Sequence, residues 1–185
     1  MGRIPNPIQA HHIFRRVKLR LLFSSDDIKN CDWGITCGPS ALAVACDLHF
    51  DSVKDAVHMA GFSKDKGHMS PTMMKAALDI LGVSFSEKDK NRKIGKREMF
   101  KRWPKSGLMR VQWDGPWYGR MAYRHTHWVA IGNLEFEQLM HVFDINAGLN
   151  LFSEWERSTV PMIIENCCPK EANGEWFPTH IWSVG

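Results

Sequence analysis

The sequence predicts an α+β domain in which a helical half is followed by an antiparallel β-sheet. The segment from Cys37 to Leu48 is small and apolar throughout, and Pro39 in its first turn favours a buried helix. Ser70 followed by Pro71 marks the start of another helix. From Val83 onward, short apolar or alternating runs are separated by turn formers, which is typical of antiparallel strands. Because the helices precede the strands instead of alternating with them, the pattern favours α+β over α/β.

Two of the predicted helices have recognisable ends. Asp51 is a suitable N-cap for a helix that stops at Gly61. The helix that begins after Ser70 stops at Gly82, where a left-handed C-cap is expected. Its apolar stripe is typical of a hydrophobic core. The residues of that stripe are Met73, Met74, Ala77, Leu78 and Leu81.

Five later segments are predicted as strands. The turn formers between them include Asp114-Gly115-Pro116 and Asn146-Ala147-Gly148. The predicted strands are Val83 to Phe85, Leu108 to Trp113, His127 to Ile131, Leu139 to Ile145 and Val160 to Ile164.

The length of 185 residues is enough for one domain with a proper hydrophobic core. We therefore expect a single domain over residues 1–185, with an N-terminal arm at 1–25 and a C-terminal tail at 166–185. The tail is rich in tryptophan between Trp176 and Trp182. Three roles are open for it: packing on the core, covering a cleft, or binding a partner.

The composition is that of an ordinary globular protein, with 44% hydrophobic residues. No stretch approaches the roughly 18 uninterrupted apolar residues of a membrane span, so no membrane partner is expected. Five cysteines at irregular spacing do not resemble a secreted disulfide framework. These features predict a cytoplasmic location. The net charge of +4 permits acidic or nucleic-acid partners without requiring them.

Cys37 is the sharpest candidate for chemistry. A cysteine that opens a helix lies at the positive end of the helix dipole, which favours thiolate over thiol. Gly38 leaves the approach to the sulfur open, and the small residues that follow let the helix sink into the core. The alternative is that a free cysteine simply packs as a small hydrophobic side chain.

A thiolate nucleophile needs a base, and the base needs an orienting group. His127 begins an apolar strand, and Asp144 lies near the end of the next strand. Two antiparallel strands joined by a loop would bring these side chains together. His125 is a rival base, because residues two apart on a strand face the same side.

The order of three segments resembles the papain-like cysteine peptidase superfamily, above all its bacteriocin-processing branch. The segments are Cys-Gly-Pro-Ser-Ala-Leu from Cys37, His-Trp-Val-Ala-Ile from His127, and Val-Phe-Asp ending at Asp144. The segment Gly67 to Pro71 also resembles small uncharacterised members found in bacteriophages and bacteria. The resemblance covers about residues 30 to 150.

This resemblance implies a papain-like fold, with the nucleophile at a helix N-terminus packed against an antiparallel sheet. It implies Cys37 as nucleophile, His127 as base and then acid, and Asp144 as the group that orients the imidazole. The family pattern has an apolar run directly after the base, which favours His127 over His125; His125 then lines the cleft or is solvated. A phage-encoded member would act in the host cytoplasm.

The chain departs from this family at one position. Papain-like enzymes usually carry a glutamine six residues before the nucleophile, whose amide helps to bind the oxyanion, and here Cys31 takes its place. Losing one oxyanion donor typically costs about 2.7–4 kcal/mol of transition-state stabilisation. Three alternatives are open: Asn30 or the Trp33 indole joins the Cys37 backbone N–H as donor, the enzyme is weak, or the fold is catalytically silent. Asn30 is preferred, since its amide is the nearest match to glutamine.

No metal or other cofactor is predicted. Cys31 and Cys37 are six residues apart, Cys167 and Cys168 are adjacent, and the pair at 11–12 is the only adjacent pair of histidines. None of these has the spacing of a zinc site.

A basic segment between Lys88 and Lys105, together with Trp103 and the arm from Arg15 to Arg20, could contact nucleic-acid phosphates. A solvated surface is the alternative. The cations assigned to such contacts are Lys90, Arg92, Lys93, Lys96 and Arg97.

Two functions are consistent with these residues. The first is a cysteine hydrolase that cleaves a peptide, isopeptide or related amide of a protein or peptide substrate through a covalent acyl-enzyme. Acyl transfer to an amine is the same chemistry with a different acceptor. The second is a catalytically silent papain-like fold that binds a protein or a nucleic acid.

Overall fold

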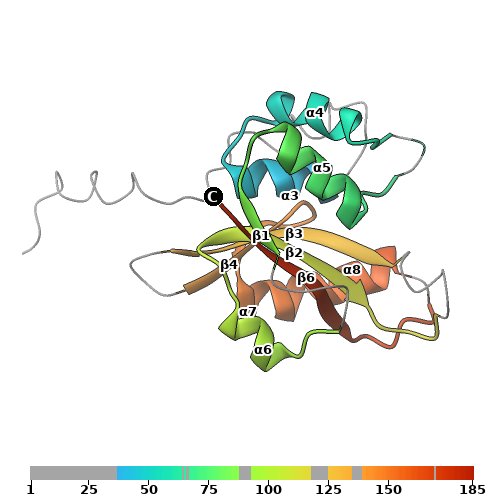
Figure 1. Ribbon diagram of the computed structural model, residues 1–185. Helices are drawn as coiled ribbons and strands as arrows, with labels where there is room; N and C mark the ends of the chain where they lie inside the picture. Colours follow the sequence, from blue (N-terminus) through green and yellow to red (C-terminus); the bar gives the residue numbers. More distant parts are fainter. Residues whose placement is uncertain are drawn as a thin grey trace, which may run out of the picture.

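Helices cover both faces of one antiparallel sheet. The computed structural model describes residues 37–63, 65, 67–87, 93–117, 125–134, 139–168 and 170–185. In this part of the chain three helices come first, and the strands and the other helices follow (Figure 1). The expected α+β class is therefore confirmed.

Helix α3 (Cys37–Cys46) is buried along nearly its whole length, as the sequence predicts. Its side chains are small, so the helix backbone comes close to the rest of the core. The closest approach is at Gly38, where an added Cβ would lie 2.6 Å from the Cβ of Met69. Glycine at this position therefore allows the start of the helix, and with it Cys37, to lie against Met69 in the segment that precedes helix α5 (Pro71–Ile80).

Helix α5 (Pro71–Ile80) has the cap that the sequence predicts. The Ser70 hydroxyl accepts a hydrogen bond from the backbone N–H of Met73 at 3.2 Å, and Pro71 stands in the first turn. The helix stops before Gly82, whose φ of +65° is the left-handed conformation expected there.

Helix α4 (Phe50–Met59) begins two residues earlier than predicted. Its N-cap is His49, whose Nδ1 accepts from the backbone N–H of Asp51 at 3.4 Å. Asp51 therefore lies in the first turn, where its negative charge suits the helix dipole, and is not the cap. The predicted stop at Gly61 is confirmed by its φ of +90°.

The sheet has six strands in the order β1-β6-β2-β3-β4-β5, and every neighbouring pair is antiparallel. Strands β2 to β5 follow one another along the chain as a meander, while β1 and β6 come from distant parts of the sequence. The bounds are β1 (Phe85–Glu87), β2 (Ser106–Trp113), β3 (Thr126–Leu134), β4 (Leu139–Asp144), β5 (Gly148–Leu151) and β6 (Trp176–Val184).

Within the segment expected as a C-terminal tail at 166–185, residues Trp176–Val184 form strand β6, so of the three roles open for the tryptophan-rich part the structure shows packing on the core. Strand β6 pairs with β1 on one side and with β2 on the other, and Trp182 is fully buried. Pro178 is tolerated within the strand because the register with β2 shifts there, between Arg110 and Val111, so that the missing N–H falls at a bulge.

The predicted strand from Val160 to Ile164 is wrong. Its residues lie in α8 (Val160–Cys167), which follows α7 (Phe152–Glu154) and a π-helical segment, η3 (Trp155–Thr159). Pro161 has no N–H for a strand ladder but fits the first turn of a helix. Val160 and Ile163, three residues apart, then face the core together.

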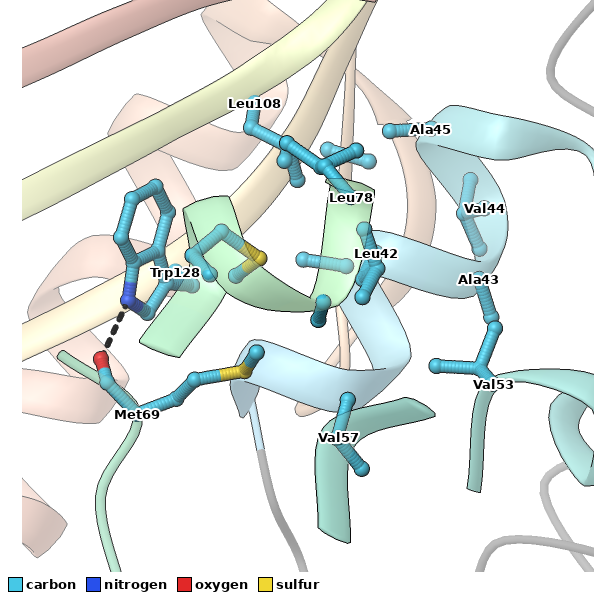
Figure 2. Close-up of a cluster of buried hydrophobic side chains, with 14 of the residues drawn as sticks. Leu42, Ala43, Val44, Ala45, Val53, Val57, Met69, Leu78, Leu108 and Trp128 are labelled. Carbon is cyan, nitrogen blue, oxygen red and sulfur yellow. Dashed lines mark hydrogen bonds between the residues drawn. The ribbon is translucent and has the colours of Figure 1, made fainter. Parts of the chain in front are cut away.

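The two faces of the sheet bury two separate hydrophobic clusters, because successive strand residues point to opposite faces. Leu108 and Trp128 face the cluster of α3, α4 and α5, which Figure 2 shows in part. In that cluster the Trp128 indole N–H donates to the carbonyl of Met69 at 2.8 Å. Met109 and Val129 face the other cluster, which includes residues of α6 (Lys96–Lys101), α7, η3 and α8.

Candidate active site

The three residues predicted as a catalytic triad lie together in the structure. Cys37 is the first residue of α3, His127 is the second residue of β3, and Asp144 is the last residue of β4. Because β3 and β4 are antiparallel neighbours, the start of one and the end of the other meet at the same end of the sheet. Helix α3 packs against β3, which brings its N-terminus to this end as well.

The Asp144 carboxylate is fully buried and accepts four hydrogen bonds. Its Oδ2 accepts from His127 Nε2 at 2.9 Å and from Trp155 Nε1 at 2.8 Å. Its Oδ1 accepts from the backbone N–H and the side-chain amide of Asn146, at 2.9 and 3.0 Å. Burial raises the pKa of Asp144, but the charge of His127 and these donors outweigh burial and hold the pKa below its usual value.

His127 lies between the carboxylate and the thiol, with one ring nitrogen for each. Nε2 is engaged by Asp144, so Nδ1 is the nitrogen left for the hydrogen bond with the Cys37 side chain. Burial lowers the pKa of His127, but the charges of Cys37 and Asp144 raise it well above its ordinary value. The Trp113 ring stacks on the imidazole at 6.2 Å between centroids.

The Cys37 thiol has its pKa lowered. Burial raises the pKa, and the charge of His127, its hydrogen bond and the backbone N–H of Trp128 outweigh that effect. The positive end of the α3 dipole acts in the same direction. The pKa values of two other cysteines are shifted in the opposite direction: burial raises the pKa of Cys46 to about 12 and that of Cys168 to about 11.

Cys37 and His127 line a cleft of about 320 Å³. Trp113, Ile145 and Ile163 give this cleft an apolar wall. Polar groups come from His125, Thr126 and Asn146, and two further cysteines, Cys167 and Cys168, also line the cleft. Cys37 is half-buried at this cleft, whose lining offers both apolar contact and hydrogen bonds.

His125, the rival base, has a different position. It precedes β3, lines the cleft and packs on the Trp117 ring at 4.1 Å between centroids. The hydrogen bond to Asp144 is made by His127. Of the two alternatives that the sequence leaves for His125, the structure has it lining the cleft.

Only part of the predicted oxyanion site can be placed. The backbone N–H of Cys37 belongs to the first turn of α3, where N–H groups have no partner within the helix. Asn30, Cys31 and Trp33 lie outside the described residues.

Three cations of the basic segment are paired with acids in the part that the structure describes. Lys93 is 3.9 Å from Asp114, Lys96 is 2.5 Å from Glu156, and Arg102 pairs with Glu98. Arg97 and Lys101 are exposed beside them. Trp103 is buried and its indole donates to the Gly132 carbonyl, so it presents no surface for base stacking. Lys90 and Arg92 lie outside the described residues.

Within the described ranges, no group of three or more His, Cys, Asp or Glu side chains is placed to hold a metal ion. Nor does any helix there have the length and apolar character needed to cross a membrane.

Two contacts of the site have no signal in the sequence, and a third has only a local hint. Trp155 and Trp113 contact the His–Asp pair from other parts of the chain, and only the fold reveals them. Asn146 was visible as part of a turn, but its two bonds to Asp144 depend on the turn geometry. An Asp-x-Asn pattern at a strand end is the one local hint of that arrangement.

No protein-family model matches this sequence, and no curated protein matches it.

Proposed function

We propose that the protein is a papain-like cysteine hydrolase that cleaves a peptide, isopeptide or related amide through a covalent acyl-enzyme. One observation carries the proposal: the His127 ring has one nitrogen for the Cys37 sulfur and the other for a fully buried Asp144 carboxylate. This is the order nucleophile, base and orienting group that thiol catalysis requires.

In the acylation step, the Cys37 thiolate attacks the substrate carbonyl carbon, and the C=O electron pair moves onto the oxygen. The backbone N–H of Cys37, in the first turn of α3, is a donor for this oxyanion. The His127 imidazolium then gives its Nδ1 proton to the leaving amine as the C–N bond breaks. The products of this step are a Cys37 thioester, a free amine and a neutral imidazole.

In the deacylation step, neutral His127 takes a proton from water through Nδ1, and the resulting hydroxide attacks the thioester. The C–S bond breaks, the acid leaves, and the thiolate–imidazolium pair is restored. An amine in place of water gives acyl transfer. Asp144 moves no proton; it keeps the Nε2–H tautomer in place, so that Nδ1 always faces the sulfur.

The cleft suits this role in size and chemistry, since about 320 Å³ lies within the range of ligand pockets. The proposal for a binding module without catalysis has less support. Two of its predicted cations, Lys93 and Lys96, are paired with acids, and Trp103 is buried.

An acyl-transfer test with p-nitrophenyl acetate examines the proposal without knowledge of the natural substrate. We expect a burst of one p-nitrophenol per protein and an acetyl group on Cys37, detected by intact mass and peptide mapping. Cys37→Ser should abolish the burst, and His127→Ala should slow it at least about a hundredfold, in line with the loss of a general base. The matched control is Cys46→Ser, which removes an inert thiol and should change nothing. Acetylation that is spread over the cysteines, or equal in Cys37→Ser, would refute the hydrolase proposal.

A further inference from the structure

The helical stretch after β5 contains an irregularity next to the site. Between α7 and α8 the five residues from Trp155 to Thr159 form a π-helical turn, a rare conformation that occurs often at functional sites. Pro161 offers a local cause, because it lacks the N–H that would bond to the carbonyl four residues earlier. The turn begins at Trp155, whose side chain contacts the site.

The Trp155 indole is held in one orientation. The residue is fully buried, and its ring packs on Trp176 at 5.2 Å and on Phe152 at 6.0 Å between centroids. Its Nε1–H donates to Asp144 Oδ2 at 2.8 Å, and this is the oxygen that also accepts from His127 Nε2. An indole N–H can only donate, and Asp144 Oδ2 is the acceptor that satisfies the buried Trp155 N–H.

We propose that Trp155 is a positioning residue of the triad, which holds Asp144 Oδ2 in line with the His127 ring; this inference rests on the hydrolase function proposed above. The two bonds from Asn146 fix only Oδ1. The Trp155 indole, from η3, fixes Oδ2. A hydrogen-bond donor at Oδ2 also favours the ionised form of the Asp144 carboxylate. The imidazole is thereby kept with Nδ1 toward Cys37.

Trp155→Phe tests the inference, with Trp176→Phe as its matched control. Both substitutions remove a buried indole from the same aromatic cluster, but only Trp155 reaches Asp144. The readout is the rate of Cys37 alkylation by iodoacetamide between pH 4 and 9. The ionisable groups that set this profile are Cys37 on α3, His127 on β3 and Asp144 on β4.

We expect Trp155→Phe to slow alkylation of Cys37 at pH 6 by about three- to tenfold and to move the midpoint of the profile upward. Trp176→Phe should stay within about twofold, with a similar loss of thermal stability. In an Asp144→Ala background, Trp155→Phe should cause no further slowing, because the two residues act as one unit. Equal effects of the two tryptophan variants, or full additivity with Asp144→Ala, would overturn the inference.

Two results separate this inference from the hydrolase proposal. If wild-type Cys37 reacts no faster than Cys46, the hydrolase proposal fails; if Cys37 is fast and Trp155→Phe changes nothing, only the inference on Trp155 fails. If Trp155→Phe does not fold, hydrogen exchange decides. The Trp155 indole N–H should exchange at least about tenfold faster in Asp144→Ala, whereas the Trp103 indole, bonded to the Gly132 carbonyl, should not change. An unchanged Trp155 exchange rate would overturn the inference.

Discussion

Asp144→Asn removes one charge while keeping the shape of the side chain, and the structure makes its effect large. Four donors converge on the carboxylate, two on each oxygen. An asparagine has one acceptor oxygen, and its NH2 group must face two N–H donors whichever way the amide is turned. With the amide oxygen toward Asn146, His127 can adapt only by moving its proton to Nδ1, and the Trp155 indole still has no acceptor.

The magnitude follows from these contacts. One buried donor left without an acceptor costs about 1–3 kcal/mol, and the loss of a charged hydrogen bond costs about 1.5–3 kcal/mol more. We therefore expect the free energy of unfolding to fall by about 3–5 kcal/mol, the usual result of breaking a buried ion pair. Without the negative charge of Asp144, the imidazolium form of His127 is no longer stabilised, and the ring stays neutral with its proton on Nδ1. The pKa of the Cys37 thiol then returns toward about 8.5, because the neighbouring positive charge is lost. Alkylation of Cys37 at pH 6 should slow by roughly 30-fold or more, because the thiolate fraction falls.

Urea unfolding followed by circular dichroism measures the first effect, and mass-spectrometric alkylation kinetics measure the second. Asp114→Asn is the matched control. Asp114 is half-exposed, accepts from the Gly115 backbone and the Asn173 amide, and pairs with Lys93 at 3.9 Å, so its loss should cost about 1 kcal/mol or less. A stability loss below 1 kcal/mol in Asp144→Asn together with unchanged Cys37 reactivity would refute the reasoning about the four donors.

Three other perturbations test the fold and the site. Gly38→Ala should destabilise the protein by about 1–3 kcal/mol and slow Cys37 alkylation, because the new Cβ must displace Met69 at the start of α3; unchanged melting and alkylation would contradict this. Deletion of residues 176–185 should leave a chain without a cooperative melting transition, since it removes β6 from between β1 and β2; a cooperative transition would show that the sheet does not need β6. The pKa of Cys37 is lowered, so its contribution to stability is fully present above about pH 8.5 and is lost as pH falls through its folded pKa. The pKa of His127 is raised to about 10, so its contribution is fully present below about pH 6.5 and is lost as pH rises through about 10. Between about pH 6.5 and 8.5 the two contributions change in opposite directions, so the difference in unfolding free energy between wild type and the Cys37→Ser/His127→Gln variant should be flat there and should fall on both sides. A steady slope from about pH 6.5 to 8.5 would disprove the ion pair.

The sequence predicted those elements whose signals are local. Helix α5 has its cap and proline side by side in Ser70 and Pro71, and strands β2, β3 and β4 have apolar runs bounded by turn formers. Cys37 and His127 were identifiable because each lies at or next to the start of an element whose pattern is strong.

The remaining features depend on tertiary contacts. The apolar run from Val160 to Ile164 has no period that separates a strand from a helix. Pro161 is a local signal against a strand, and packing against the sheet completes the preference for a helix. Strand β6 was hidden because Pro178 interrupts it, and only the bulge opposite Arg110 and Val111 makes the proline acceptable. Trp155 reaches Asp144 through a π-helical turn that no sequence pattern announces.

The place of β6 in the sheet has a consequence for how the chain folds. The meander from β2 to β5 forms from neighbouring segments, whereas β6 must return from beyond α8 to separate β1 from β2. We expect β6 to pair late in folding, because closing the long loop costs conformational entropy before the stabilising contacts with β1 and β2 have formed. Until β6 docks, β2 presents an unpaired edge that a second chain can occupy with its own β6. Refolding at high concentration should therefore yield strand-exchanged dimers, and rapid dilution should favour monomers.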